Sequence, residues 1–183
     1  MTDQLANPFI SPLFDMKVPP GDDKMRRVCS HCHFIDYVNP KIVAGSVVTK
    51  NGQILLCRRA IEPRKGYWTL PAGFMEVGET VEDAARREAQ EEACADIRIE
   101  QLLAVYSVPR IAQVQVMFRA TLESDIVAGP ESEEVGLFDW KDIPWSELAF
   151  PTVVWALTQY AETRHLPVFP PYANPPGTAK LTH

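Results

Sequence analysis

The sequence predicts an α/β fold in which a mixed β-sheet is sandwiched between helices. Alternating apolar residues indicate several strands, and two separate segments have apolar residues at helical spacing. Because the helices are few and dispersed among the strands, we expect them to pack on the faces of one sheet. The chain has 183 residues, 46% of them hydrophobic and 23% charged, which suits one domain with a short appendage.

Five segments are predicted as strands because they are apolar or alternate between apolar and polar residues. They span residues 41–49, 53–58, 97–108, 112–123 and 135–140. Asn51-Gly52 is typical of a two-residue turn, so the first two strands are expected to form a hairpin. A polar loop is expected to follow them over residues 59–66.

Two segments are predicted as helices. Near residues 80–94, several alanines favour a helix, and Thr80 with Asp83 suits a capping pair at its start. The second predicted helix begins at Pro151, since proline suits the first helical turn. Apolar residues recur after it at helical spacing.

The composition changes at both ends of the main domain. Prolines and Gly21 interrupt any regular pattern in residues 1–24, so this part is expected to be irregular. We place an N-terminal segment at residues 1–40, the main domain at residues 41–166 and a Pro-rich tail at residues 167–183. The tail is expected to be extended or loose.

The charge of the chain restricts its partners. The formal net charge is −6 and the isoelectric point is about 5.2, which does not favour nucleic acid or an anionic membrane. The N-terminal residues lack the pattern of a signal peptide, and no apolar stretch is long enough to span a bilayer. The cytoplasm is therefore the expected compartment, where a disulfide framework among the four cysteines is not expected.

The first predicted helix crowds three carboxylates onto one face. Glu88, Glu91 and Glu92 lie at i, i+3 and i+4, a spacing at which like charges repel by about 0.2–0.5 kcal/mol per pair. Glu91 and Glu92 also oppose the helix dipole near its C-terminal end. Oxygen ligands in such an array suit Mg²⁺, which completes its shell with water and phosphate oxygens. The alternative is an ordinary solvated acidic face.

The residues around these carboxylates carry a specific resemblance. The segment Gly73-x5-Glu79-x7-Arg87-Glu88-x-x-Glu91-Glu92 resembles the box of the Nudix hydrolases, G-x5-E-x7-R-E-U-x-E-E-x-G-U. One departure is that Cys94 stands in place of the closing glycine, and Ala95 in place of the closing aliphatic residue. Because a left-handed conformation is costly for cysteine, we expect the helix to run on to Asp96 and the Cys94 side chain to pack.

The resemblance implies a fold and a set of metal ligands. A Nudix fold is expected over most of residues 41–165. The implied ligands are Glu88, Glu92 and the backbone carbonyl of Ala72, with Glu91 as a further ligand or as the base. Mg²⁺ is the expected cofactor, with Mn²⁺ as an alternative.

Further roles follow from the same resemblance. Arg87 is expected to pair with Glu79 and to orient the carboxylates. Some family members take the catalytic base from the box and others from a later loop. The loop ahead of residues 135–140 carries three glutamates, of which Glu134 is preferred as the base, then Glu133, over Glu131. A purely solvated loop is the alternative.

Residues of the polar loop are candidates for contacts to the substrate. Basic side chains there could bind phosphate, and aromatic side chains could stack on a base. The basic candidates are Arg58, Arg59, Arg64 and Lys65, and the aromatic candidates are Tyr67, Trp68 and Tyr106. Trp68, between apolar strand residues, is more typical of the core.

The implied reaction is metal-dependent hydrolysis of a nucleoside diphosphate linked to another moiety. ADP-ribose or an FAD-like dinucleotide would give AMP and a second phosphomonoester. A house-cleaning hydrolase of nucleoside triphosphates, and a non-catalytic sensor of a nucleotide-sugar, are the alternatives. The downstream motif of NADH pyrophosphatases is not found in the sequence. Because family members of this size are often homodimers, a homodimer is expected.

The N-terminal segment resembles the zinc ribbon of a Nudix subgroup that acts on ADP-ribose and FAD. A ribbon needs two knuckles and four ligands, and this segment supplies Cys29 and Cys32. The other knuckle would fall near Asn7 and Ile10, which do not bind zinc. We therefore predict a degenerate ribbon without a stable zinc site. A metal-binding interaction module built on Cys29 and Cys32 is a further alternative.

Overall fold

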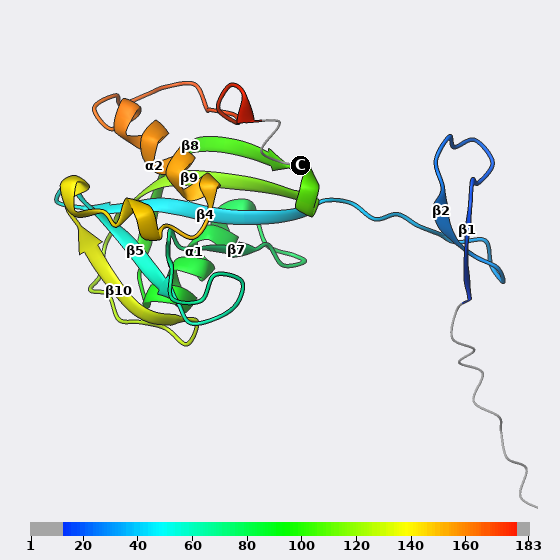
Figure 1. Ribbon diagram of the computed structural model, residues 1–183, viewed down its shortest axis with the longest axis horizontal. Coiled ribbons are helices and arrows are strands. Elements are labelled where there is room, and N and C mark those ends of the chain that lie inside the picture. The colour runs from blue at the N-terminus through cyan, green and yellow to red at the C-terminus, as the bar shows by residue number, and fades with distance from the viewer. Residues whose placement is uncertain (1–12, 179–183) are drawn as a thin grey trace, which may run out of the picture. The chain divides into compact units, whose positions relative to one another are not determined.

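The computed structural model describes residues 13–178, and the chain divides into two compact units, Met1–Asn39 and Pro40–His183. The larger unit contains one mixed sheet (Figure 1). Its strands are β4 (Lys41–Lys50), β5 (Gln53–Arg59), β6 (Trp68–Thr69), β7 (Ala72–Phe74), β8 (Ile97–Val108), β9 (Gln113–Leu122) and β10 (Ser132–Phe138). The strand order is β10-β5-β4-β9-β8, while β6 pairs with β5 and β7 with β4. β4 and β9 are parallel and the other pairs antiparallel, so the predicted mixed sheet is confirmed.

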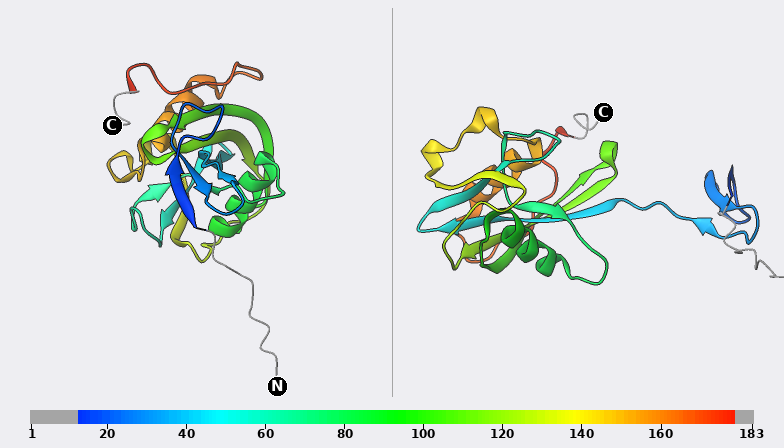
Figure 2. Two further views of the ribbon diagram at one scale, coloured as in Figure 1. Left: turned by 90° about the vertical axis from the view of Figure 1, so that its right-hand side faces the viewer. Right: turned by 90° about the horizontal axis from the view of Figure 1, so that it is seen from below.

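Two α-helices cover opposite faces of this sheet (Figures 1 and 2). They are α1 (Val81–Ala93) and α2 (Pro151–Thr163), and 3₁₀ turns occur at η1 (Pro109–Ile111), η2 (Trp140–Asp142) and η3 (Trp145–Glu147). Successive strand residues point to opposite faces. Val47 packs in the cluster that contains the apolar residues of α2, and Val48 in a cluster with the alanines of α1. The small side chains of α1 allow its backbone to lie close to the sheet.

The predicted strands and their hairpin are confirmed with small changes at their ends. The strand over residues 97–108 has the predicted bounds, and Asn51 and Gly52 both have positive φ, as this type of hairpin turn requires. β10 begins three residues earlier than predicted, because Ser132 already pairs with Arg59 across a bulge.

The predicted C-terminal end of the first helix is wrong. α1 ends at Ala93, and Cys94 adopts the left-handed conformation with φ of 49°, while its side chain is exposed. A loop explains why this conformation is tolerated. The backbone N–H of Val127 donates to the carbonyl of Ala93, and that of Gly129 donates to the carbonyl of Glu92, so the last turn is capped from outside the helix.

The tail is not loose where the structure describes it. Tyr172 exchanges backbone hydrogen bonds with Leu103 and Val105 of β8, at 2.8 and 3.0 Å. The side chain of Asn174 also bonds both backbone groups of Ser107. Residues 172–174 therefore cover part of the outer edge of β8, which would otherwise present unpaired backbone groups.

The N-terminal unit contains a small antiparallel sheet in the order β1-β2-β3. Its strands are β1 (Phe14–Lys17), β2 (Arg26–Cys29) and β3 (Ile35–Asp36). The expectation that residues 1–24 are irregular is therefore wrong for β1. Across residues 13–178, no helix has the length and apolar character needed to cross a membrane.

Candidate active site

The guanidinium of Arg87 connects the acidic residues of α1 to the loop that precedes the helix. It donates to both carboxylate oxygens of Glu79, at 2.9 and 3.1 Å, and to the Phe74 carbonyl at 2.9 Å. Its Nη1 atom also donates to Glu88 at 2.8 Å and Glu91 at 2.9 Å. The predicted pairing of Arg87 with Glu79 is therefore present. The positive charge of the Arg87 guanidinium offsets part of the repulsion among the carboxylates and fixes the orientation of Glu88.

The glycine that opens the motif leaves room for one of these carboxylates. A Cβ atom on Gly73 would lie 2.3–2.4 Å from the carboxylate atoms of Glu88. Gly73 belongs to β7, so the absent side chain lets this short strand pass directly behind the Glu88 carboxylate. The same strand brings the backbone N–H of Ala72 to Glu92, where this donor opposes the rise in the Glu92 pKa that burial causes.

Glu88 and Glu92 are two buried carboxylates on adjacent turns of α1, with exposed fractions of 6% and 4%. Burial, followed by the charge of Glu88, raises the pKa of Glu92 to about 8. Burial also raises the pKa of Glu88, although Arg87 opposes this shift. The Oε2 atom of Glu92 is buried and has no hydrogen-bond partner. Such an atom is costly unless a proton or a cation occupies the position beside it.

These residues fit a divalent cation by their chemistry. Two acidic side chains with an orphaned carboxylate oxygen provide the hard oxygen donors that Mg²⁺ or Mn²⁺ prefers. In the described part of the chain, no three His, Cys, Asp or Glu side chains converge as a complete metal cage. Glu91, the expected third carboxylate, is half-exposed and bonded to Arg87. The site therefore supplies two carboxylates and leaves further positions for water and substrate oxygens.

Of the three glutamates in the later loop, Glu131 is the one whose charge contributes to the pKa shifts of Glu88 and Glu92. Its charge raises the pKa values of both Glu88 and Glu92. Glu134 is instead within 3.7 Å of Arg58, and Glu133 lies between Arg58 and Lys65 at 3.9 and 3.8 Å. Sequence reasoning ranked Glu131 last because the order of residues in a loop does not indicate which side chain faces the helix.

Of the basic candidates, Arg59 is the one that acts on the buried carboxylates. Its charge lowers the pKa of Glu92, and its guanidinium lies 5.3 Å from the centroid of the Phe150 ring. Its Nε atom donates to the carbonyl of Pro63 at 2.8 Å. Arg58 instead donates to the carbonyl of Gly66, and Arg64 stacks on Tyr67.

The aromatic candidates differ in whether a substrate could reach them. Tyr67 is 37% exposed and is accessible on the surface of the loop. Trp68 is a core residue, as expected. Tyr106 does not suit the stacking role, because it has no exposed surface and its hydroxyl bonds to Gln159 in the core below α2. The sequence of residues 97–108 alone did not indicate that the face of the sheet carrying Tyr106 is covered by α2.

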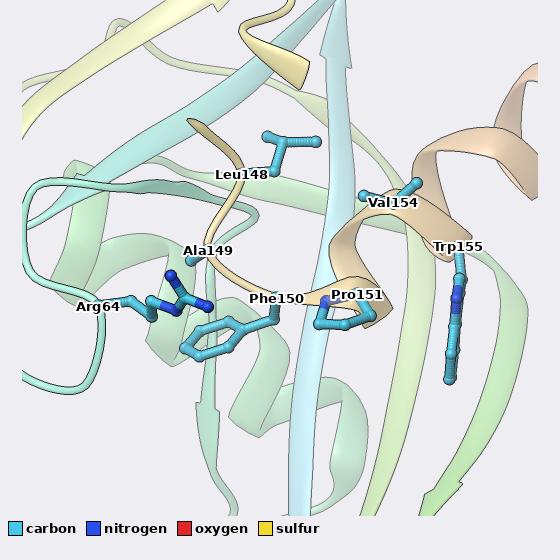
Figure 3. Close-up of a pocket in the computed structure, with 7 residues that line it drawn as sticks. All are labelled: Arg64, Leu148, Ala149, Phe150, Pro151, Val154 and Trp155. Carbon is cyan, nitrogen blue, oxygen red and sulfur yellow. The ribbon is translucent and has the colours of Figure 1, made fainter. Parts of the chain in front are cut away.

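A cavity of about 350 Å³ lies between the loop after β5 and the start of α2 (Figure 3). Its walls are mostly apolar, with one guanidinium, and are formed by Arg64, Leu148, Ala149, Phe150, Pro151, Val154 and Trp155. Phe150 lines this cavity, and its ring also contacts Arg59. The charge of Arg59 acts on Glu92, so the cavity lies beside the residues that surround the carboxylates. Sequence reasoning missed this cavity, since residues 148–155 carry no polar motif and gave only a helix signal.

Comparison with known proteins agrees with the fold. The sequence profile of the NUDIX domain matches residues 39–159, and a zinc-ribbon profile described as Nudix N-terminal matches residues 12–38. The crystal structure of a NUDIX hydrolase from Nitrosomonas europaea superposes with a TM-score of 0.84 at 43% identity, covering 92% of this chain and 97% of that chain.

Two curated relatives have named activities. An ADP-ribose pyrophosphatase of Methanocaldococcus jannaschii is 35% identical over 119 residues, which are 62% of this chain and 69% of the relative. A NAD-capped RNA hydrolase, NudC, of Salmonella heidelberg is 34% identical over 131 residues, covering 68% of this chain and 49% of the relative. The chain thus spans about half the length of that second relative. With the NUDIX profile matching well over half of its residues, the chain belongs to the Nudix hydrolase family.

Proposed function

We propose that this protein is a metal-dependent pyrophosphohydrolase that cleaves a nucleoside diphosphate linked to another moiety, releasing AMP and a second phosphomonoester. The observation that carries the proposal is the orphaned, buried Oε2 atom of Glu92 beside Glu88. A buried carboxylate oxygen without a partner beside a second buried carboxylate lowers stability, so stability alone does not explain this pair. ADP-ribose is the first substrate to test, because a relative named for that activity is 35% identical over 119 residues.

The residues of α1 would hold a divalent cation and orient it. Glu88 and Glu92 are the proposed ligands, together with the carbonyl of Ala72 and, when Arg87 releases it, Glu91. When bound, a Mg²⁺ or Mn²⁺ ion would neutralise charge on the pyrophosphate and make water easier to deprotonate. Arg87 keeps Glu88 in place through its bond at 2.8 Å and anchors itself on Glu79.

We propose Glu131 as the first candidate for the base that takes the proton from the attacking water. Its charge acts on both Glu88 and Glu92, and its side chain is exposed, so it can exchange protons with solvent. Glu134, preferred on sequence grounds, and Glu133 are placed beside Arg58. Comparing kcat of Glu131→Gln with that of Glu134→Gln would separate the two candidates, since loss of a general base typically costs about 10²–10⁴-fold.

Arg59 and the neighbouring cavity would bind the rest of the substrate. The charge of Arg59 interacts with that of Glu92, and its guanidinium would donate hydrogen bonds to a phosphate oxygen. Tyr67 and the cavity beside Phe150 offer apolar surface for a ring or a sugar. Arg58 is a second candidate for the phosphate, because its ion pairs with Glu133 and Glu134 are long and exposed.

The experiment is to measure phosphomonoester release from a panel of substrates with Mg²⁺, with Mn²⁺ and with chelator. The panel contains ADP-ribose, FAD, NADH, a nucleotide-sugar, a nucleoside triphosphate and an NAD-capped RNA. We expect cation-dependent cleavage of ADP-ribose or FAD that falls by orders of magnitude in Glu92→Gln. Thermal stabilisation by one ligand without any turnover would instead indicate a sensor. The homodimer, the cytoplasmic location and the absence of nucleic-acid partners stay predictions.

A further inference from the structure

The cysteine pair of the N-terminal unit does not fit the zinc ion that its matched profile implies. Within residues 13–178, no third acidic, histidine or cysteine side chain joins Cys29 and Cys32 in a possible metal site. Asn7 and Ile10, at the positions expected for the other knuckle, lie outside the described residues and are not zinc ligands by type. The larger unit carries a better-defined site, in the cavity beside Phe150.

The two walls of this cavity are fixed by backbone hydrogen bonds. On one side, the N–H of Ala149 donates to the carbonyl of Trp68 in β6 at 2.8 Å. On the other side, the loop that carries Arg64 is closed by the N–H of Gly66, which donates to the carbonyl of Arg59 at 2.8 Å. Because both walls are held in this way, the cavity exists before a ligand enters it, which lowers the entropy that binding costs.

Two guanidinium groups at the cavity have no carboxylate partner. Most arginines in residues 13–178 form an ion pair, whereas Arg59 and Arg64 have no carboxylate within 4.0 Å in that part of the chain. Arg59 lies 5.3 Å from the centroid of the Phe150 ring, and the Arg64 side chain extends toward the same ring (Figure 3). In a chain with a net charge of −6, two unpaired cations beside one cavity favour an anionic ligand.

The other walls favour a flat ring over a sugar. Apart from Arg64, the side chains are apolar and belong to Leu148, Ala149, Phe150, Pro151, Val154 and Trp155. A ribose carries several hydroxyl groups, which lose hydrogen bonds to water when they enter such surroundings. A nucleobase instead offers a flat face that packs against aromatic side chains. The volume of about 350 Å³ lies within the usual range of small-molecule sites.

Arg59 interacts with both the cavity and the carboxylates, because its guanidinium contacts Phe150 and its charge acts on Glu92. We propose that the cavity binds the nucleoside monophosphate half of the substrate, with the base against Phe150 and the phosphate between Arg59 and Arg64. The second half of the substrate then lies outside the cavity. This assignment rests on the proposed function, because it names the part of that substrate which the cavity holds. Since these contacts come from the protein alone, the product AMP should bind without a cation and should inhibit hydrolysis.

Binding of AMP to the full-length, metal-free protein tests the proposal. Titration calorimetry in chelator compares AMP with its two fragments, adenosine and ribose 5-phosphate. We expect AMP to bind at least about tenfold more tightly than either fragment, because it alone presents both the base and the phosphate. An affinity for AMP that does not exceed that of both fragments by this margin would overturn the proposal. No bond is cleaved in this measurement, so a failure of the proposed hydrolysis would leave its result unchanged.

Variants locate the two parts of the site. Arg64→Gln should lower the affinity for AMP by about tenfold or more and leave that for adenosine unchanged, because a donor to the phosphate is lost. Arg164→Gln makes the same charge change at the other end of α2 and should bind AMP like the wild type. Val154→Trp places an indole in the cavity from a position that is 37% exposed, and should weaken binding of both AMP and adenosine. Melting temperatures establish that the variants are folded, and an unchanged AMP affinity in folded Arg64→Gln or Val154→Trp would contradict the assignment.

Discussion

The guanidinium of Arg87 donates two hydrogen bonds to the carboxylate of Glu79, which lies eight positions earlier in the chain. This bidentate pair fastens the loop after β7 to the second turn of α1. Because the same guanidinium also bonds Glu88 and Glu91, it offsets repulsion that the helix would otherwise carry. The pair therefore connects the local stability of α1 to the orientation of the proposed metal ligands.

Arg87→Gln should damage both stability and activity. The free energy of unfolding should fall by about 2 kcal/mol, since charge-assisted bonds to Glu79 and Glu88 are lost, and kcat should fall by about 10–100-fold. Chemical denaturation and initial rates measure the two effects. Arg86→Gln is the matched control, because Arg86 is more exposed and its one ion pair joins it to Asp83 at 3.0 Å. Equal effects of both substitutions would show that Arg87 acts only as a surface charge.

The stability of the metal-free protein should depend on pH through Glu92. Burial raises the pKa of this carboxyl to about 8, from 4.5 in the unfolded chain. Between those values the folded state binds more protons than the unfolded state, so the free energy of unfolding falls as pH rises from about 4.5 to about 8. Melting temperatures in chelator should show this decline in the wild type and a smaller one in Glu92→Gln. Glu82→Gln, on the same helix, should keep the full decline, and identical profiles for all three proteins would contradict the assignment.

Gly129 should not tolerate a side chain. A Cβ atom there would lie 1.8 Å from the backbone carbonyl oxygen of Glu91, and backbone atoms have little freedom to move. Gly129→Ala should therefore lower the free energy of unfolding by about 3 kcal/mol and displace the loop that carries Glu131. Gly136→Ala is the control, because its Cβ would meet only the ring of Phe138, at 2.9 Å. Denaturation and kcat should both change more for Gly129→Ala, and the opposite order would be inconsistent with this packing.

Cys94→Gly should stabilise the protein. Cys94 adopts φ of 49°, a conformation that costs an L-residue about 1 kcal/mol and glycine much less. The melting temperature should rise by a few degrees with no loss of activity. Gln90→Gly, at an exposed position inside the same helix, should lower stability by about 1 kcal/mol. A lower melting temperature for Cys94→Gly would mean that the cysteine side chain contributes more than its conformation costs.

Much of the fold could be predicted from the sequence because its elements have strong local signals. The alternation in residues 112–123 and the caps around residues 80–94 placed β9 and the start of α1. The end of α1 was wrong because the distant residues Val127 and Gly129 donate to the carbonyls of Ala93 and Glu92, just before Cys94.

The parts of the site that were missed depend on tertiary contacts. Arg59 acts on Glu92 and contacts Phe150, which lies about ninety residues further along the chain. The charge of Glu131 acts on Glu88 and Glu92, and its place beside Ala60 depends on the pairing of β10 with β5. The burial of Tyr106 likewise depends on α2, which no local pattern in its strand predicts.

The central claim is that Glu88 and Glu92 hold a divalent cation against a pyrophosphate. The most direct measurement is the binding isotherm of Mn²⁺, in the presence of a non-hydrolysable methylene analogue of ADP-ribose, for the wild type and for Glu92→Gln. The account predicts binding in the wild type and an affinity about 100-fold lower in the variant, since a buried carboxylate ligand is removed. Equal Mn²⁺ affinity in the two proteins, with the variant still folded, would contradict it.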